Sequence, residues 1–182
     1  MDNINLSVVR ETFGKIVYSH KTHEKAADIC ITKNKWFKRI NVLLITLTSG
    51  SALGSILKGD YYLISTSILS TVTLFFVIYQ LSLNLEQEAQ NHKRTAKKLW
   101  LMREKYQNFI ADIINGRHQI NQIANMRNEL LSELNKIIED TPQTDSKAYY
   151  KARKALKIEE EMTFSKSEID SFLPEELRIN RS

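Results

Sequence analysis

The chain has few of the residues that interrupt helices or cross-link a fold. Its 182 residues include one cysteine, two prolines and five glycines. The single Cys30 excludes an intramolecular disulfide, which is consistent with a reducing cytoplasm. The opening residues MDNINLSVVRETFGK lack the apolar stretch of a signal peptide, so no cleaved leader is expected. With so few helix breakers, most of the chain is predicted to be helical.

Charge is nearly absent from one window. Between residues 40 and 85 only Lys58 and Asp60 are charged, although charged residues make up 26% of the chain. The uncharged runs on either side of this pair are roughly 18 and 25 residues long, and a helix needs about 20 to cross the hydrocarbon core. Two buried helices of a soluble protein are the alternative, but the remaining chain has too little apolar surface to cover them. The sequence therefore predicts two membrane helices, 40–57 and 61–85, joined by a short external turn, 58–60.

Basic residues flank both predicted spans. No acid lies between Ile29 and Gly59, and the second span is followed by a cluster of lysine, arginine and histidine. The positive-inside rule therefore places both termini in the cytoplasm. The same cations would contact anionic lipid headgroups, which explains the net charge of +5 without nucleic acid. The expected headgroup contacts are Lys35, Lys38, Arg39, Lys93, Arg94, Lys97 and Lys98.

Small residues are concentrated in the first span. Within TSGSALGS, Gly50 and Gly54 form a GxxxG motif, and Ser51 and Ser55 repeat the spacing. Such residues let two helix backbones approach closely in lipid. We expect close helix packing here, although the motif does not identify the partner helix.

The second span carries a mostly polar line along one side. Its members recur at steps of three and four, which places them on one face of a helix. Polar groups facing lipid are costly, so this stripe would face either protein or water. The residues alone favour interhelical packing but leave pore lining open. The stripe consists of Thr66, Ser70, Thr73, Val77, Gln80 and Asn84.

Apolar residues outside the membrane recur with helical spacing. Residues 1–39 are predicted to form a cytoplasmic helix that continues into the first span, with the stripe Leu6, Val9, Phe13, Ile16, His20, His23, Ala27 and Cys30. Residues 86–140 are predicted to form one long heptad helix, kinked at Asn115-Gly116, with the seam Leu99, Met102, Tyr106, Phe109, Ile113, Gly116, Ile120, Ile123, Arg127, Leu130, Leu134 and Ile137. The two segments would pair as an antiparallel, coiled-coil-like stalk.

Residues 141–182 follow as a linker, an amphipathic helix and a short EIDSFLP element with Ser167 as its expected N-cap. The overall prediction is an all-α membrane protein, a transmembrane hairpin that extends into cytoplasmic helices and assembles into oligomers.

Chemical sites are hard to find in this sequence. His20 and His23 lie three apart, but no third ligand is near in sequence, so a metal site is not expected. Cys30 has no neighbouring base, and Arg127 is interpreted as a polar residue of the seam that pairs with Glu129 or an acid on another helix. No catalytic triad, carboxylate pair or phosphate loop is evident, so we expect neither an enzyme nor a bound cofactor.

Three segments together resemble the SLATT family, the two-transmembrane effector domains of bacterial nucleotide-signalling defence systems. They are KNKWFKRINVLL, LEQEAQNHKRTAKKLWLMREKY and SEIDSFLPEELR, and the resemblance extends from about Glu11 to Arg178. It implies an inner-membrane effector of abortive infection that oligomerises into a pore after a nucleotidyltransferase makes a second messenger. The chain shows no fused sensor domain, so a separate sensor protein is an alternative trigger.

The resemblance shifts the interpretation of the polar stripe towards a pore. One hairpin cannot enclose water, so several copies would be needed. The alternative function is a non-conducting two-span anchor that presents a cytoplasmic coiled coil to a partner.

Overall fold

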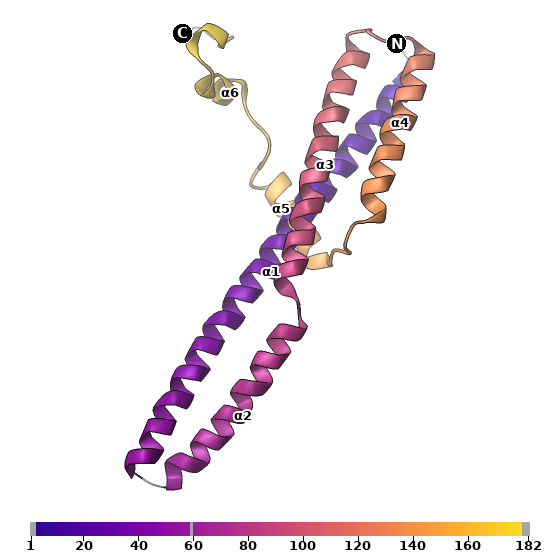
Figure 1. The fold of residues 1–182 in the computed structure, drawn as a ribbon. Helices are drawn as coiled ribbons and strands as arrows, with labels where there is room; N and C mark the ends of the chain where they lie inside the picture. The colour runs from indigo at the N-terminus through magenta and orange to yellow at the C-terminus, as the bar shows by residue number, and fades with distance from the viewer. Residues whose placement is uncertain (1–2, 59, 180–182) are drawn as a thin grey trace.

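The computed structural model describes residues 3–58 and 60–179, and helices are the only regular secondary structure in this part of the chain. The predicted all-helical class is therefore confirmed for these residues. Gly59, in the predicted external turn, lies outside the described residues. Figure 1 shows a long helical pair with two shorter helices beside its upper half. The elements are α1 (Asn3–Lys58), α2 (Asp60–Ser82), α3 (Leu85–Ile114), α4 (Ile120–Glu139), α5 (Ser146–Lys157), α6 (Lys166–Phe172) and the 3₁₀ turn η1 (Glu175–Leu177).

Helix α1 runs without interruption from the N-terminal segment to the end of the first span. Its 56 residues contain no proline, so no backbone hydrogen bond of the helix is lost. Its first half buries one stripe, including Val9 and Ile16, against the rest of the cytoplasmic part. The expected continuity between the N-terminal helix and the first span is therefore confirmed.

The second span ends earlier than predicted. Helix α2 stops at Ser82, and the Leu83 amide donates a hydrogen bond to the Gln80 carbonyl at 3.3 Å, which tightens the last turn. Asn84 then adopts the left-handed conformation (φ 45°), which asparagine tolerates better than most residues, and caps α3. Leu85, predicted as the last membrane residue, is instead the buried first residue of α3.

The expected single helix over residues 86–140 is wrong. Helix α3 ends at Ile114, Gly116 takes a positive φ of 69°, and α4 returns alongside α3 (Figure 1). A hairpin and a kink both preserve the three-and-four spacing, because α3 and α4 each bury one stripe in the same core. The spacing could not distinguish them.

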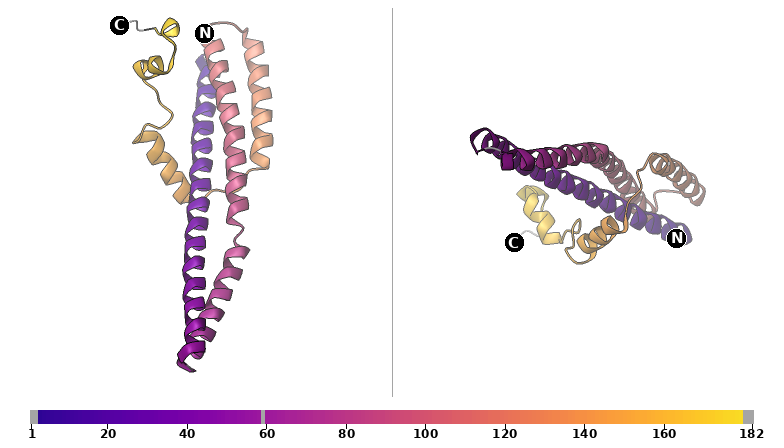
Figure 2. Two further views of the ribbon diagram at one scale, coloured as in Figure 1. Left: turned by 60° about the vertical axis from the view of Figure 1, so that its left-hand side comes forward. Right: turned by 90° about the horizontal axis from the view of Figure 1, so that it is seen from below.

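The core outside the membrane hairpin forms where α1 and α3 lie antiparallel, and α4 covers one edge of this pair (Figure 2). We call the body formed by the first half of α1 with α3, α4 and α5 the stalk. Helix α5 packs on α1 through Ala148, Ala152 and Ala155, all fully buried, because small side chains allow close approach. The principal core side chains are Val9, Ile16, Leu99, Met102, Tyr106, Phe109, Ile113, Ile123 and Leu134.

Helix α6 lies apart from the stalk in both figures. Its N-cap is Ser165, whose side chain accepts a hydrogen bond from the Glu168 amide, and the Glu168 carboxylate accepts one from the Ser165 amide. The predicted cap, Ser167, is therefore wrong. The capping box S-x-x-E begins at Ser165, and it is the reciprocal Glu168 contact that selects this serine.

Candidate functional site

The two membrane helices contact each other through polar side chains. Thr66 Oγ1 lies 2.8 Å from Ser51 Oγ, and Thr73 Oγ1 lies 3.2 Å from Thr48 Oγ1. Nearer the stalk, the Asn41 amide donates to Gln80 Oε1. Each pair joins α1 to α2, so the polar groups satisfy one another within a single chain. Such bonds are worth about 0.6 kcal/mol each on average in membrane proteins.

The predicted stripe divides into two groups in this arrangement. Thr66, Thr73, Val77 and Gln80 are half-buried against α1, whereas Ser70 and Asn84 are exposed. Asn84 also lies beyond the end of α2, at the break before α3. In the single chain the stripe thus lies between two helices, and its lining of a pore stays a prediction.

Sequence reasoning named Ser51 and Ser55 for close helix packing but missed Asn41 and Thr48, the other polar residues on this face of α1. Asn41, Thr48, Ser51 and Ser55 are separated by steps of seven, three and four, so they form a matching polar face. Three of them bond to α2, as described above, and Ser55 bonds the Ala52 carbonyl of its own helix. The signal was present in the sequence as the helical spacing of these polar residues.

The two glycines of the GxxxG motif have different surroundings. A methyl group at Gly54 would lie 2.6 Å from Tyr62 Cδ1, so this position requires a glycine for the observed approach. Gly50 has no neighbour within 4 Å of such a group, which leaves that face open. Gly54 is therefore a contact between α1 and α2, and Gly50 faces away from α2.

Much of the surface of this hairpin is apolar and uncovered. Phe75 is 72% exposed and Leu81 70% exposed, and large apolar side chains on the outer faces of both helices are similarly open. A patch of this extent on a soluble monomer would drive aggregation, whereas lipid would cover it. Both helices are long and apolar enough to cross a membrane.

Aromatic and basic residues surround the end of the hairpin nearest the stalk. Phe37 packs on Phe76 with ring centroids 5.3 Å apart, and the Arg39 guanidinium lies over Trp36 at 6.0 Å. Lys35, Lys38 and Arg39 are exposed at this level, as predicted headgroup contacts should be.

Helix α5 adds Lys147 and Lys151 to this basic group, where they share a shallow pocket with Trp36. Sequence reasoning missed both lysines because they lie more than one hundred positions further along the chain.

The basic cluster after the second span lies on the first half of α3. Lys93, Arg94, Lys97 and Lys98 are all exposed. Lys97 is twelve residues past the start of α3, a rise of ~18 Å. Lys93 and Lys97 line a groove of the stalk instead. A headgroup role for these four residues stays a prediction.

Three histidines are buried in the stalk. His23 Nδ1 lies 2.9 Å from His92 Nδ1, and His20 Nδ1 lies 2.9 Å from the Ala96 carbonyl oxygen. Burial, together with the neighbouring His92 and His20, lowers the pKa of His23 to about 4, and burial also lowers the pKa of His92. The pairing of His23 with His92 was missed, because only the fold brings positions 69 apart together. Among the described residues, no group of three or more potential ligands could hold a metal ion.

Cys30 and Arg127 have structural surroundings. Cys30 Sγ lies 3.7 Å from Glu88 Oε2, and burial with this carboxylate raises the pKa of the thiol, so it stays protonated at neutral pH. Arg127 donates to Asn5 Oδ1 at 2.6 Å and joins α4 to α1. Arg127 therefore bonds the side-chain amide of Asn5, where an acid was predicted as its partner.

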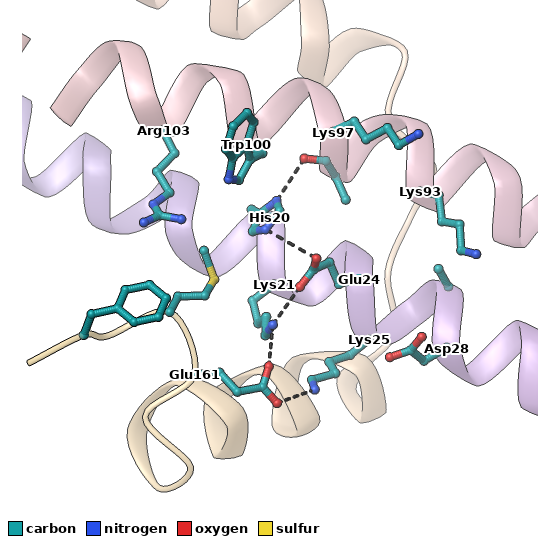
Figure 3. A pocket seen from close by; sticks show the side chains of 14 residues that line it. His20, Lys21, Glu24, Lys25, Asp28, Lys93, Lys97, Trp100, Arg103 and Glu161 are labelled. Atoms are coloured by element: carbon teal, nitrogen blue, oxygen red, sulfur yellow. Dashed lines mark hydrogen bonds and ion pairs between the residues drawn. The ribbon is translucent and has the colours of Figure 1, made fainter. Parts of the chain in front are cut away.

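The largest cavity described lies in the stalk between α1, α3 and the segment after α5, with a volume of about 710 Å³ (Figure 3). Glu161 reaches Lys21 Nζ at 2.5 Å and Lys25 Nζ at 2.9 Å. Burial disfavours the charge of Lys21, but the hydrogen bonds that Lys21 donates to Glu161 and Glu24 outweigh it and raise its pKa. The same lysines lower the pKa of Glu161. We refer to this cavity as the stalk groove.

Comparison with known proteins gives one match. The family model described as "SMODS and SLOG-associating 2TM effector domain family 4", a SLATT model, matches residues 6–168. No curated protein and no solved structure matches the chain.

Proposed function

Because the chain belongs to the SLATT family of two-transmembrane effector domains and is thus a membrane effector of defence systems, we propose that it acts by permeabilising the membrane. In this proposal, several copies assemble in the bacterial inner membrane when a nucleotide signal or a partner sensor triggers them. The assembled hairpins then form a pore or disrupt the bilayer. The affected cell stops growing or dies before phage can spread.

The polar contacts between α1 and α2 are the observation that carries this proposal. Thr66, Thr73 and Gln80 bond to side chains of α1 within one chain. If neighbouring copies separated the two helices, these groups would need water or the partner copy to replace the lost bonds. In a ring of hairpins, the polar contact between α1 and α2 could thus change from dry to hydrated, as in a two-state switch.

A triple leucine variant tests the pore. Thr66→Leu/Thr73→Leu/Gln80→Leu should abolish ion flux while membrane insertion persists, because leucine cannot stabilise a water-filled path. The control is Ser67→Leu/Thr71→Leu/Ser82→Leu, whose hydroxyls are exposed and bond only to carbonyls of their own helix. Expression would be induced in bacteria with and without the genomic neighbours, and membrane potential recorded with a voltage-sensitive dye before growth. Equal depolarisation by both variants would mean that the polar contacts between α1 and α2 take no part in ion flux.

A non-conducting anchor is the second candidate. It is favoured by the observation that the interhelical polar pairs are already satisfied within one chain. An unchanged membrane potential under every trigger, with growth arrest that depends on the stalk, would support it.

A further inference from the structure

The stalk groove has two facing walls and a third side formed by the segment after α5. Helix α1 contributes Lys21 and Lys25, and α3 contributes Lys93, Lys97 and Trp100 (Figure 3). The volume of about 710 Å³ falls within the ~300–1,000 Å³ of small-molecule sites. The groove is therefore large enough to hold a ligand with a ring and several polar groups.

Positive charge exceeds negative charge in this groove. Five cationic side chains line it, namely Lys21, Lys25, Lys93, Lys97 and Arg103, against the three acids Glu24, Asp28 and Glu161. Within the described part of the chain, Lys93 and Lys97 form no ion pair. Among the described residues, Glu24 and Glu161 are the acids within ion-pair distance of Lys21, whose side chain is 9% exposed. When Glu161 leaves, Glu24 stays beside Lys21, but Lys25 loses its carboxylate partner. An anion is therefore the group best suited to take the place of Glu161.

The Glu161 carboxylate is supplied by a strained turn. Glu160 and Met162, on either side of it, have φ angles of 50° and 72°, a left-handed region that non-glycine residues rarely adopt. Strain of this kind persists where surrounding contacts hold it. Here the contacts are the two ion pairs to α1 and two backbone hydrogen bonds, from the Glu161 amide to the Ala155 carbonyl and from the Thr163 amide to the Glu160 carbonyl. Losing the ion pairs leaves only the local backbone bonds at this turn, which favours release of residues 158–179 from α1.

Flat rings lie at the edges of the same groove. Trp100 is 50% exposed and Phe164 is 57% exposed, although both line the cavity. Exposed aromatic faces beside lysines are the combination that stacks a base while neutralising its phosphate. The residues thus suit a ligand with both an anionic group and a flat ring.

The α1 wall of the groove, with Lys21 and Lys25, lies beyond the reach of a lipid headgroup. Asp28 is the groove residue of α1 nearest the membrane, and it precedes the predicted start of the span at Ile40 by a rise of ~18 Å. The headgroup layer on each side of the hydrocarbon core is only about 5–8 Å thick. A soluble ligand is therefore favoured over a lipid.

We propose that the stalk groove binds a soluble organic phosphate bearing a flat aromatic ring, such as a nucleotide, whose phosphate displaces the Glu161 carboxylate from Lys21 and Lys25. Displacement frees the turn around Glu161 and with it the C-terminal segment. Binding at this groove does not require ion conduction, so the test below and the flux test above fail independently.

The test measures binding to the full chain in detergent micelles. Trp36→Phe leaves Trp100 as the only tryptophan. Its fluorescence would be followed during titration with ATP, cyclic AMP and cyclic di-AMP, with adenosine, pyrophosphate and dihexanoylphosphatidylglycerol as comparators. We expect saturable quenching by at least one nucleotide. Glu161→Gln should tighten that binding roughly tenfold, the effect of removing a competitor worth about 1.4 kcal/mol.

Charge-matched double variants locate the site. Lys25→Gln/Lys97→Gln removes two groove cations and should abolish the quenching, whereas Lys15→Gln/Lys136→Gln, outside the groove, should leave it unchanged. Bound nucleotide should also speed tryptic cleavage at Lys166, and Glu161→Gln should do so without ligand.

Four results would each overturn the proposal. They are no quenching by any of the three nucleotides, quenching that survives Lys25→Gln/Lys97→Gln, equal affinity for adenosine or pyrophosphate, and binding of the short lipid alone.

Discussion

His23 and His92 share one hydrogen bond inside the stalk, and this bond requires the accepting ring to be neutral. One Nδ1 donates and the other accepts, so a proton added to the acceptor breaks the bond and places charge in a buried site. The unfolded chain takes up that proton near pH 6.5, but the folded chain resists it down to a pKa of about 4 at His23. The unfolded state therefore binds more protons between these values, and stability falls as pH falls through this window.

This residue pair gives a pH prediction. The thermal midpoint of the stalk, measured by circular dichroism in detergent, should fall by several degrees between pH 7.5 and pH 5. In His23→Leu/His92→Leu both partners become apolar, so the dependence on pH should largely disappear. His118→Gln keeps the pair and serves as the control with a wild-type pH profile. A double variant that retained the full pH dependence would assign it to other groups.

The sequence predicted much of the core at the level of elements. The spacing that selected Leu99, Met102, Tyr106, Phe109 and Ile113 placed all five in the core. The same spacing failed at Gly116, because α4 folds back and still presents Ile123 and Leu134 to the core. Periodicity reports which face of a helix is buried, but it does not report the direction in which the next helix runs.

The stalk groove could not have been read from the sequence at all. Its cations belong to two helices, and Glu161 reaches Lys25 across 136 positions. In the sequence, Lys93 and Lys97 looked like membrane-surface residues, and nothing linked Glu161 to them. Local spacing carries no information on contacts between positions this far apart. The polar face of α1 that contacts α2, in contrast, could be predicted from the helical spacing of its residues.

A substitution in α3 tests the packing of this element. Met102 is fully buried, whereas its neighbour Leu101 is 51% exposed. Met102→Ala should cost about 2–5 kcal/mol of stability because it leaves a cavity between α1 and α3. Leu101→Ala should change stability by no more than about 0.5 kcal/mol. Thermal and denaturant unfolding of the two purified variants would compare them, and equal losses would contradict the packing described here.

At the scale of the whole molecule, the described ends of the chain lie opposite the turn between α1 and α2 (Figure 1). If the basic flanks orient the hairpin as predicted, the end of α1 faces outward and α4 faces the cytoplasm. In a Cys30→Ser background, Lys58→Cys should react with a membrane-impermeant maleimide in intact cells. Asn121→Cys should react only after the cells are permeabilised. The reverse pattern would invert the predicted orientation.

The two arms that connect the stalk to the membrane hairpin, α1 on one side and α2 with α3 on the other, differ mechanically. Helix α1 is one rod of ~84 Å that passes from the stalk through the predicted span without a break. The other arm has a joint, because Leu83 and Asn84 belong to neither α2 nor α3. A displacement of α1 at the stalk is therefore carried to the membrane as tilt or rotation of the entire rod. A displacement of α3 reaches α2 only through two residues, so α2 is the arm free to swing away from its partner.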